Sequence, residues 1–195
     1  LVLMAGHGNY TVIGKTRDDA AGEAFDKGAR LLGLGFPGGP AIQKMAETAD
    51  QGMKFPRAWL GNSFDFSFSG LKTSLLHRTQ QFKSDSFDET GQVKQSVIAS
   101  QAAAYQEAIA DVLSQKAVKA VEVYKVRGLL LGGGVAANSR LRDLINLRSP
   151  VPTLIPKNSL CTDNGAMIAA AAYQNLRSGI RSSFDLDVNP NMSLG

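Results

Sequence analysis

The chain has 195 residues, of which 44% are hydrophobic, and its 21 Lys and Arg against 17 Asp and Glu give a formal net charge of +4. A chain of this length and composition can bury a core, which argues against intrinsic disorder, and no apolar run approaches the roughly 20 residues of a membrane-spanning helix. The positive charges are scattered, so they are compatible with a polyanionic partner without forming a basic run typical of nucleic-acid binding.

The start of the chain and its single cysteine indicate where the protein works. Leu1 is not an initiator methionine and no secretory signal surrounds it, so residues 1–5 are expected to be a strand cut midway in the C-terminal piece of a larger protein. Cys161 is the only cysteine, which excludes an internal disulfide and predicts a small buried side chain. We expect a cytoplasmic protein, because a chain without disulfides suits a reducing compartment.

The first 50 residues predict a hairpin followed by two helices. Residues 1–5 and 10–14 are short, apolar and β-branched, with a glycine-rich connection between them. A helix with Asp18 as its N-cap should follow and end at Gly33 or Gly35. A second helix is expected over residues 41–49, with Pro40 at its first position.

The middle of the chain predicts a long loop, a strand and two helices. Residues 50–63 lack periodicity, and long loops in compact domains are often functional. Residues 64–68 alternate between apolar and polar side chains, which predicts a half-buried strand before a helix over 71–80. The polar, turn-rich residues 84–91 are a candidate lobe boundary, and a long helix is expected over 92–126, with a possible break.

The last third alternates between strands and helices. Strands are expected at residues 129–131 and 152–155, and helices at 136–147 and 164–176. Strands joined through helices require crossover connections. The sequence therefore predicts an α/β protein with a mixed or parallel sheet flanked by helices.

Three consecutive glycines mark the sharpest local feature of the sequence. An apolar strand runs directly into Gly132, Gly133 and Gly134 before a helix begins. Glycines there allow a ligand to approach the backbone, and the N-terminus of the helix favours negative charge. The spacing differs from the dinucleotide and P-loop fingerprints, which disfavours a Rossmann fold and a P-loop NTPase. A purely structural tight turn explains the glycines equally well.

Acidic residues supply further candidates. Asp163 stands before the last helix, where a carboxylate can cap the helix, ligate a metal or hold a catalytic water. Asp19, Glu23 and Asp26 are spaced by four and three residues, which places them on one helical face. Such a face is ordinarily solvated, although it could also face a ligand hydroxyl or a metal.

The two histidines and the missing hydrolase motifs exclude other chemistry. His7 and His77 lie far apart and in no metal-ligand spacing, so we expect both at the surface. The sequence contains neither a His-Glu-x-x-His element nor a Gly-x-Ser-x-Gly elbow. Hydrolase chemistry therefore has no support.

Five blocks of the sequence together resemble the TsaD family. They occur in the family's order at residues 18–27, 36–40, 66–73, 132–138 and 161–167. The resemblance implies a transferase that moves a threonylcarbamoyl group from threonylcarbamoyl-AMP to N6 of the adenosine at position 37 in tRNAs reading ANN codons. It also implies the actin-like ATPase (ASKHA) fold, in which two ribonuclease-H-like lobes close around a nucleotide.

The resemblance also implies roles for individual residues. Asp26 matches the aspartate that holds the ribose, Asn138 matches a substrate-binding asparagine, and Asp163 matches a ligand of the catalytic metal, which is iron or zinc in relatives. The implied pocket for the adenylate or ATP consists of Asp26, Gly39, Gly132, Gly133, Gly134 and Asn138. The implied partners are tRNA, threonylcarbamoyl-AMP and accessory proteins similar to TsaB and TsaE.

One departure from the family pattern limits these expectations. Family members carry a His-x-x-x-His pair and a Gly-Gly-His-Thr loop upstream of the position that matches Leu1, and this chain contains neither. Asp163 alone cannot hold a catalytic metal, since such sites normally use about three protein ligands. We therefore expect residues 1–195, as the C-terminal portion of a TsaD-like protein, to be inactive alone and to ligate the metal incompletely.

Two other functions stay open at this point. A noncatalytic scaffold paralogue of the same complex would keep the fold for partner contact, but it need not retain Asp26, Asn138 and Asp163. A sugar-kinase-like ATP phosphotransferase would share the glycine-rich adenosine turn. The block at residues 67–72 argues against that second alternative.

Overall fold

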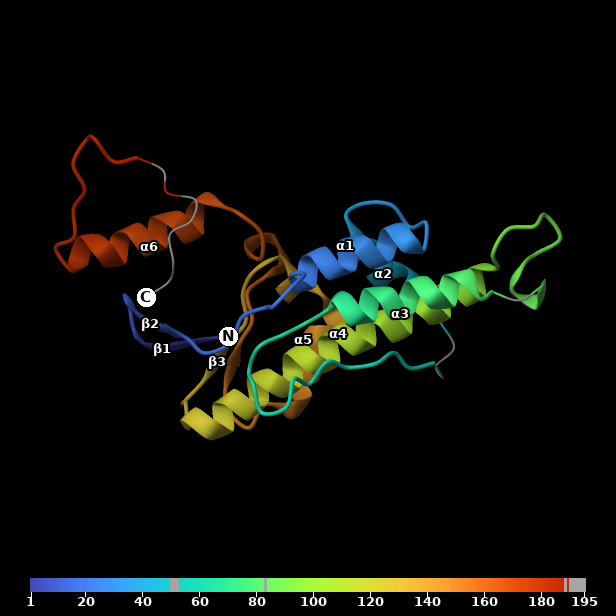
Figure 1. Cartoon of the computed structure of the whole chain (residues 1–195). Helices are drawn as coiled ribbons and strands as arrows, with labels where there is room; N and C mark the ends of the chain where they lie inside the picture. The colour runs from blue at the N-terminus through green and yellow to red at the C-terminus, as the bar shows by residue number, and fades with distance from the viewer. Residues whose placement is uncertain (50–52, 83, 188, 190–195) are drawn as a thin grey trace.

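The computed structural model describes residues 1–49, 53–82, 84–187 and 189, and Figure 1 shows the path of the chain. The helices are α1 Ala21–Leu31, α2 Gly38–Ala46, α3 Ser69–Gln80, α4 Gln95–Tyr124, α5 Ser139–Arg148 and α6 Gly165–Arg177. The strands are β1 Val2–Gly6, β2 Asn9–Val12, β3 Leu129–Leu130 and β4 Thr153–Leu154. Short 3-10 turns are η1 Ser84–Ser86, η2 Gly134–Ala137 and η3 Asn158–Leu160. No helix within the described ranges is long and apolar enough to cross a membrane.

The long helix α4 is the centre of the molecule, with α1, α2, α3 and α5 packed along it (Figure 1). Tyr105 of α4 is fully buried, its hydroxyl donates to the carbonyl of Ala24 at 2.9 Å, and its ring meets Phe55 edge-on at 5.9 Å. A Cβ at Gly28 would lie 2.4 Å from the Tyr105 ring, so α1 approaches α4 this closely only because that residue is glycine. The apolar periodicity of the sequence therefore produces one helical body around Tyr105.

A second apolar cluster joins α5 to the middle of α4. Its most buried members are Ala110 and Ile145, each at most 1% exposed, and Leu141 and Leu144 complete the α5 side. The side chains of Leu131 and Val135 pack against the same cluster. This packing fixes the glycine-rich turn, which lies between Leu131 and Val135, relative to the helical body.

The strands form two separate two-stranded sheets in the described part of the chain. β1 and β2 pair antiparallel with Val2 opposite Val12, while β3 and β4 pair parallel with Leu129 opposite Thr153. Parallel neighbours require a crossover, and α5 supplies it. The α/β class is therefore confirmed, and β3 and β4 pair parallel as the strand–helix–strand order predicted, but within the described residues the two pairs do not join into one mixed or parallel sheet.

The N-terminal boundaries depart from the expected ones. Ala20 is the N-cap of α1, so the prediction of Asp18 as its cap is wrong, because the Asp18 carboxylate bonds instead to the start of α3. α2 begins at Gly38 and not at residue 41, since Pro37 already has the extended conformation of an N-cap. The hairpin and the end of α1 before Gly33, whose φ is +70°, are confirmed.

The predicted strand over residues 64–68 is wrong. Only an isolated parallel bridge joins Phe66 to Thr16, and the segment then turns directly into α3. The alternation reflects burial instead, because Phe66 and Phe68 both point into the core and stack with ring centroids 6.3 Å apart. Residues 53–63 are irregular as predicted, whereas residues 50–52 lie outside the described residues.

The remaining elements agree more closely with the sequence. α4 runs without a break, which removes the interruption that we considered. η2 and α5 replace the single helix expected over residues 136–147, and η1 lies within the turn-rich segment 84–91. Cys161 is buried, while His7 and His77 are exposed, all as predicted.

Candidate functional site

Asp26 and the two glycines that begin α2 meet in space. Asp26, near the middle of α1, accepts a hydrogen bond from the backbone N–H of Gly38 at 2.8 Å. A Cβ on Gly38 would lie 2.5 Å from the Cα of Asp26, so the close approach of α2 to α1 requires glycine there. A Cβ on Gly39 would meet nothing within 4 Å, which means that open space lies beside its backbone. Asp26 and Gly39 therefore share one junction, and the carboxylate retains further acceptor capacity there.

The triple glycine forms an exposed turn between β3 and η2. Gly133 has a φ of +85°, a conformation that favours glycine, and a Cβ on Gly132, Gly133 or Gly134 would meet nothing within 4 Å. Behind the turn, a Val135 methyl group lies 3.6 Å from the position that a Cβ of Gly22 in α1 would take. The turn thus packs on α1 through Val135 while its glycine backbone stays open to a flat ligand.

The start of α5 connects this turn to α2 and α4. The backbone N–H of Ser139 donates to Oε1 of Gln43 in α2 at 2.8 Å. Nδ2 of Asn138 donates to Oε1 of Gln106 in α4 at 2.8 Å. The structure therefore places the Asp26 junction and the glycine turn on neighbouring elements, α1, α2 and η2.

Asn138 is engaged within the protein. It is the N-cap of α5, since its Oδ1 accepts from the N–H of Leu141 at 3.0 Å, and the residue is only 7% exposed. With Nδ2 bonded to Gln106, both polar atoms of the side chain have partners. Its observed role is to fix the start of α5 just after the glycine turn.

Asp163 lies in the exposed connection between η3 and α6. Asn164, and not Asp163, caps α6, because its Oδ1 accepts from the N–H of Met167 at 3.0 Å. The buried residue nearest to Asp163 in sequence is Cys161, which is 4% exposed. The Sγ atom of Cys161 lies 3.2 Å from Nη2 of Arg142 in α5. No sequence signal pointed to Arg142, whose contacts connect residues far apart along the chain.

The described residues do not form a metal site by themselves. Nowhere in the described ranges do three or more His, Cys, Asp or Glu side chains gather closely enough to hold a metal ion. Asp163 supplies one carboxylate, whereas a catalytic zinc site takes about three protein ligands. A metal at Asp163 would need donors from outside the described residues.

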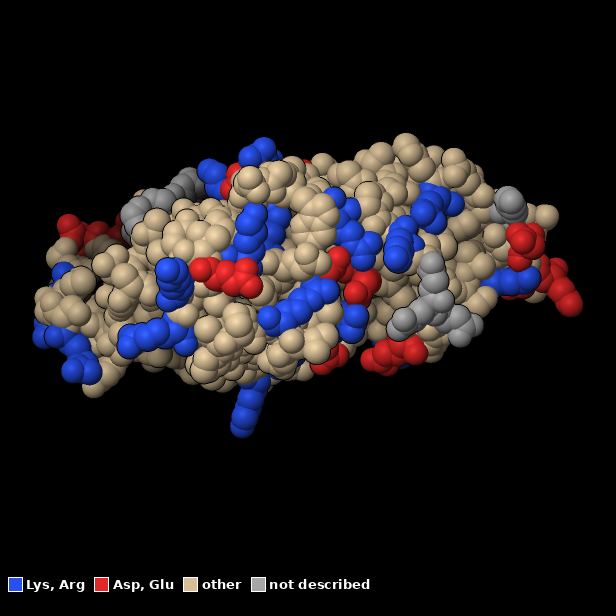
Figure 2. All heavy atoms as spheres, turned by 90° about the horizontal axis from the view of Figure 1, so that it is seen from below, with Lys and Arg blue, Asp and Glu red and all other residues tan. Residues whose placement is uncertain are grey.

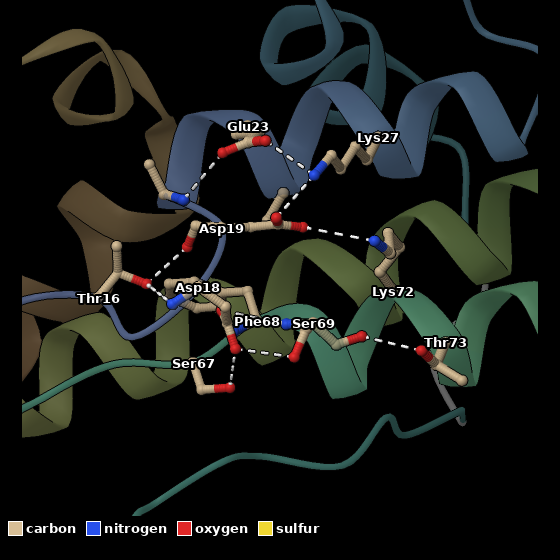
Figure 3. Close-up of polar contacts among 12 residues, drawn as sticks. Thr16, Asp18, Asp19, Glu23, Lys27, Ser67, Phe68, Ser69, Lys72 and Thr73 are labelled. Carbon is tan, nitrogen blue, oxygen red and sulfur yellow. Dashed lines mark hydrogen bonds and ion pairs between the residues drawn. The ribbon is translucent and has the colours of Figure 1, made fainter.

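A polar cluster that the sequence did not predict surrounds Asp18 (Figure 3). Its carboxylate accepts from the N–H of Phe68 at 2.8 Å and the N–H of Ser69 at 3.3 Å, and from the hydroxyls of Ser67 and Ser69. Partial burial raises the pKa of Asp18, but these hydrogen bonds outweigh it and lower the pKa to about 2. Asp18 thus closes the N-terminus of α3 from 50 residues away.

Asp19, which precedes α1, and the acidic residues of α1 do not converge on one point. Oδ1 of Asp19 lies 2.6 Å from Nζ of Lys27, which also pairs with Glu23 at 2.8 Å (Figure 3). The other Asp19 oxygen is buried without a hydrogen-bond partner in the described structure, with Nζ of Lys72 at 3.8 Å. Because Asp26 is bonded to Gly38 instead, lysines neutralise Asp19 and Glu23 while Asp26 serves the α1–α2 junction.

Charge is mixed on the face of the molecule shown in Figure 2. Lysine and arginine side chains extend along its whole length, with acidic side chains between them. This distribution fits the scattered charges of the sequence. No single-sign patch dominates that face.

A family model and curated relatives that match this chain carry the same name. A family model described as "tRNA N6-adenosine threonylcarbamoyltransferase", TsaD, matches residues 1–170. Proteins named tRNA N6-adenosine threonylcarbamoyltransferase include one from Thermomicrobium roseum, 51% identical, and one from Dehalococcoides mccartyi, 46% identical. A third, from Halalkalibacterium halodurans, is 46% identical. Each alignment covers 100% of this chain and 57%, 56% and 56% of these relatives in turn, so the chain spans about half their length.

Proposed function

Because the chain belongs to the TsaD family, we propose that it forms the adenylate-binding part of a tRNA N6-adenosine threonylcarbamoyltransferase. Its ligand is threonylcarbamoyl-AMP, and the acceptor is N6 of the adenosine at position 37 in tRNAs reading ANN codons. The observation that carries the proposal is the Asp26–Gly38 contact beside an open glycine turn, on elements that pack together.

The proposed site suits an adenosine on chemical grounds. The open backbone at Gly132–Gly134 can lie against a purine, because no side chain stands between them. A ribose diol presents two hydroxyl donors, and a carboxylate such as Asp26 has several lone pairs to accept them. The bond from Gly38 holds that carboxylate in place before the ligand arrives.

The proposed reaction is an acyl transfer to an amine. N6 of the tRNA adenosine attacks the carbamoyl carbonyl carbon and forms a new C–N bond. The bond from that carbon to the phosphate oxygen breaks, AMP leaves as the anion, and N6 loses a proton. The residues of this chain hold the adenylate so that its carbonyl stays oriented during the attack.

The remaining requirements lie beyond the described residues. The metal proposed at Asp163, iron or zinc, lacks enough ligands in the described structure, so no step is assigned to it. Accessory proteins similar to TsaB and TsaE are proposed partners of the whole enzyme. The chain alone is expected to bind the nucleotide without modifying tRNA, which tandem mass spectrometry of digested tRNA would check.

Calorimetric titration of the chain with AMP tests the proposed adenylate site. Gly133→Val should abolish AMP binding, since it adds a branched side chain in the open space and strains a backbone with a φ of +85°. Gly91→Val is the matched control, because Gly91 has a φ of +79° and equally open surroundings but lies in a distant turn. AMP binding that survives Gly133→Val at the affinity of the Gly91→Val variant would refute the assignment.

A further inference from the structure

Arg142, on the first turn of α5, contacts the segments on both sides of the candidate site. Its Nε donates to the carbonyl of Ala136 in η2 at 2.6 Å. Its Nη2 donates to the carbonyl of Pro156, after β4, at 2.8 Å, and lies 3.2 Å from Sγ of Cys161. One guanidinium therefore joins the glycine-rich turn to the segment that leads to Asp163.

The partners of Arg142 differ from those of the other arginines on α5. Arg140 pairs with Glu107, with an N–O distance of 2.5 Å, and Arg148 pairs with Asp111 at 2.8 Å. Within the described ranges no carboxylate pairs with Arg142, and two backbone carbonyls and a sulfur take its donors instead. Charge-assisted bonds are stronger than neutral ones, and the rigid planar fork fixes the spacing of its acceptors.

The segment before Asp163 depends on this arginine. Asp163 itself is exposed and forms no hydrogen bond or ion pair within the described structure, and the α6 that follows has no buried residue there. Cys161 is the buried residue nearest to it in sequence, and Arg142 is the side chain that contacts its sulfur. Arg142 therefore acts together with the β3–β4 pairing and the packing of Ile155 to hold the segment that leads to Asp163 near the glycine turn.

We propose that Arg142 is a positioning residue that keeps the turn at residues 132–137 and the segment at 156–163 in fixed register. The proposal rests on the proposed function, since the first segment carries the glycine turn of the proposed adenylate site and the second leads to the proposed metal ligand Asp163. Binding of an adenylate at the turn orders the Ala136 carbonyl, which accepts a hydrogen bond from Arg142. The same guanidinium contacts Cys161, so the ordering of the turn also orders the segment around Cys161. By linkage, ordering the Asp163 segment strengthens nucleotide binding equally.

Hydrogen–deuterium exchange of the chain tests the contact without ligand. The reporters are amides already bonded in each segment: Ala136 and Asn138 at the turn, and Leu160 and Cys161 beyond β4. Arg142→Met should accelerate exchange at both pairs by roughly tenfold or more, since a factor of ten corresponds to about 1.4 kcal/mol. Arg142→Lys keeps the charge but loses the fork, so its rates should fall between wild type and Arg142→Met.

The matched control is Arg140→Met, two residues earlier on the same helix. It breaks the pair with Glu107 and should leave exchange of all four amides within about twofold of wild type, since independent sites do not couple. Equal acceleration by Arg140→Met and Arg142→Met would reduce Arg142 to a general stabiliser of α5. Unchanged exchange in Arg142→Met would overturn the proposal. Should Arg142→Met not fold, Arg142→Lys carries the same comparison.

Adding AMP separates this proposal from the proposed function. In wild type, saturating AMP should slow exchange at Leu160 and Cys161 as well as at the turn. If calorimetry shows that Arg142→Met still binds AMP, then AMP should slow exchange in this variant only at the turn amides of Ala136 and Asn138. Equal slowing of Leu160 and Cys161 in both proteins would overturn the coupling. If AMP binds neither wild type nor any variant, the proposed function is contradicted. The exchange rates measured without AMP would still test the positioning role of Arg142.

Discussion

The helices α4 and α6 are both rich in alanine, yet their surroundings are opposite. α4 has 16 buried residues and organises the helical body, whereas α6 has none within the described structure and its Ile168 and Tyr173 are exposed. Figure 1 shows α6 standing apart from the packed helices. Composition alone does not decide whether a helix is stable, because most helical stability comes from packing an apolar face.

The largest expected effect lies at the centre of α4. Tyr105→Ala should reduce the free energy of unfolding by about 3–5 kcal/mol, because it leaves a cavity between α1 and α4 and removes the bond to Ala24. Ile168→Ala in α6 is the comparison and should change it by less than about 0.5 kcal/mol, since its side chain is already 64% exposed. Urea denaturation of both variants checks the contrast, and a similar loss at both positions would contradict it.

The helices α5 and α6 both begin at an asparagine N-cap, but the two caps differ in burial. Asn138 and Asn164 each accept a backbone N–H at 3.0 Å, but only Asn138 is buried and bonded to a second side chain. Asn138→Ala should cost about 2 kcal/mol of global stability, because it removes the cap and leaves Gln106 without its donor. Asn164→Ala should lower the helicity of α6 and leave the main unfolding transition in place. Circular dichroism during thermal unfolding would separate these outcomes, and equal shifts in Tm would refute the distinction.

The smallest effect is a pH dependence of the contact between α1 and α3. The pKa of Asp18 is lowered from 3.8 to about 2, so its hydrogen bonds stabilise the fold fully above about pH 4, and this contribution is lost as the pH falls through 2. The change is small because Asp18 is largely exposed. Asp18→Asn should flatten the fall of Tm between pH 4 and pH 2 relative to wild type, and a parallel fall in both proteins would contradict the assignment.

The sequence predicted those features that depend on local pattern. The periodic apolar residues placed α4, and the three glycines after an apolar strand marked the exposed turn, because helix periodicity and glycine backbone freedom are both local properties. The family resemblance singled out Asp26 and Gly39, which the structure places at one junction.

The features that the sequence could not predict depend on distant contacts. Asp18 resembled the N-cap of α1, but its partners are Ser67, Phe68 and Ser69, about 50 residues away. Alternation over residues 64–68 indicated a strand, although it arises from two phenylalanines packing into the helical body. Arg142 carries no local signal, since it joins Ala136, six residues earlier, to Pro156 and Cys161, which follow 14 and 19 residues later.

NMR mapping of AMP binding on the isotope-labelled chain shows directly whether α1, α2 and the glycine turn form one site. AMP should perturb the amides of Gly38, Gly39 and Gly132–Gly134 together, because Asp26 joins α1 to α2 and the glycine turn packs on α1. Perturbations confined to other surfaces, or none at AMP concentrations that saturate calorimetric binding, would contradict the claim that these elements form one adenylate site.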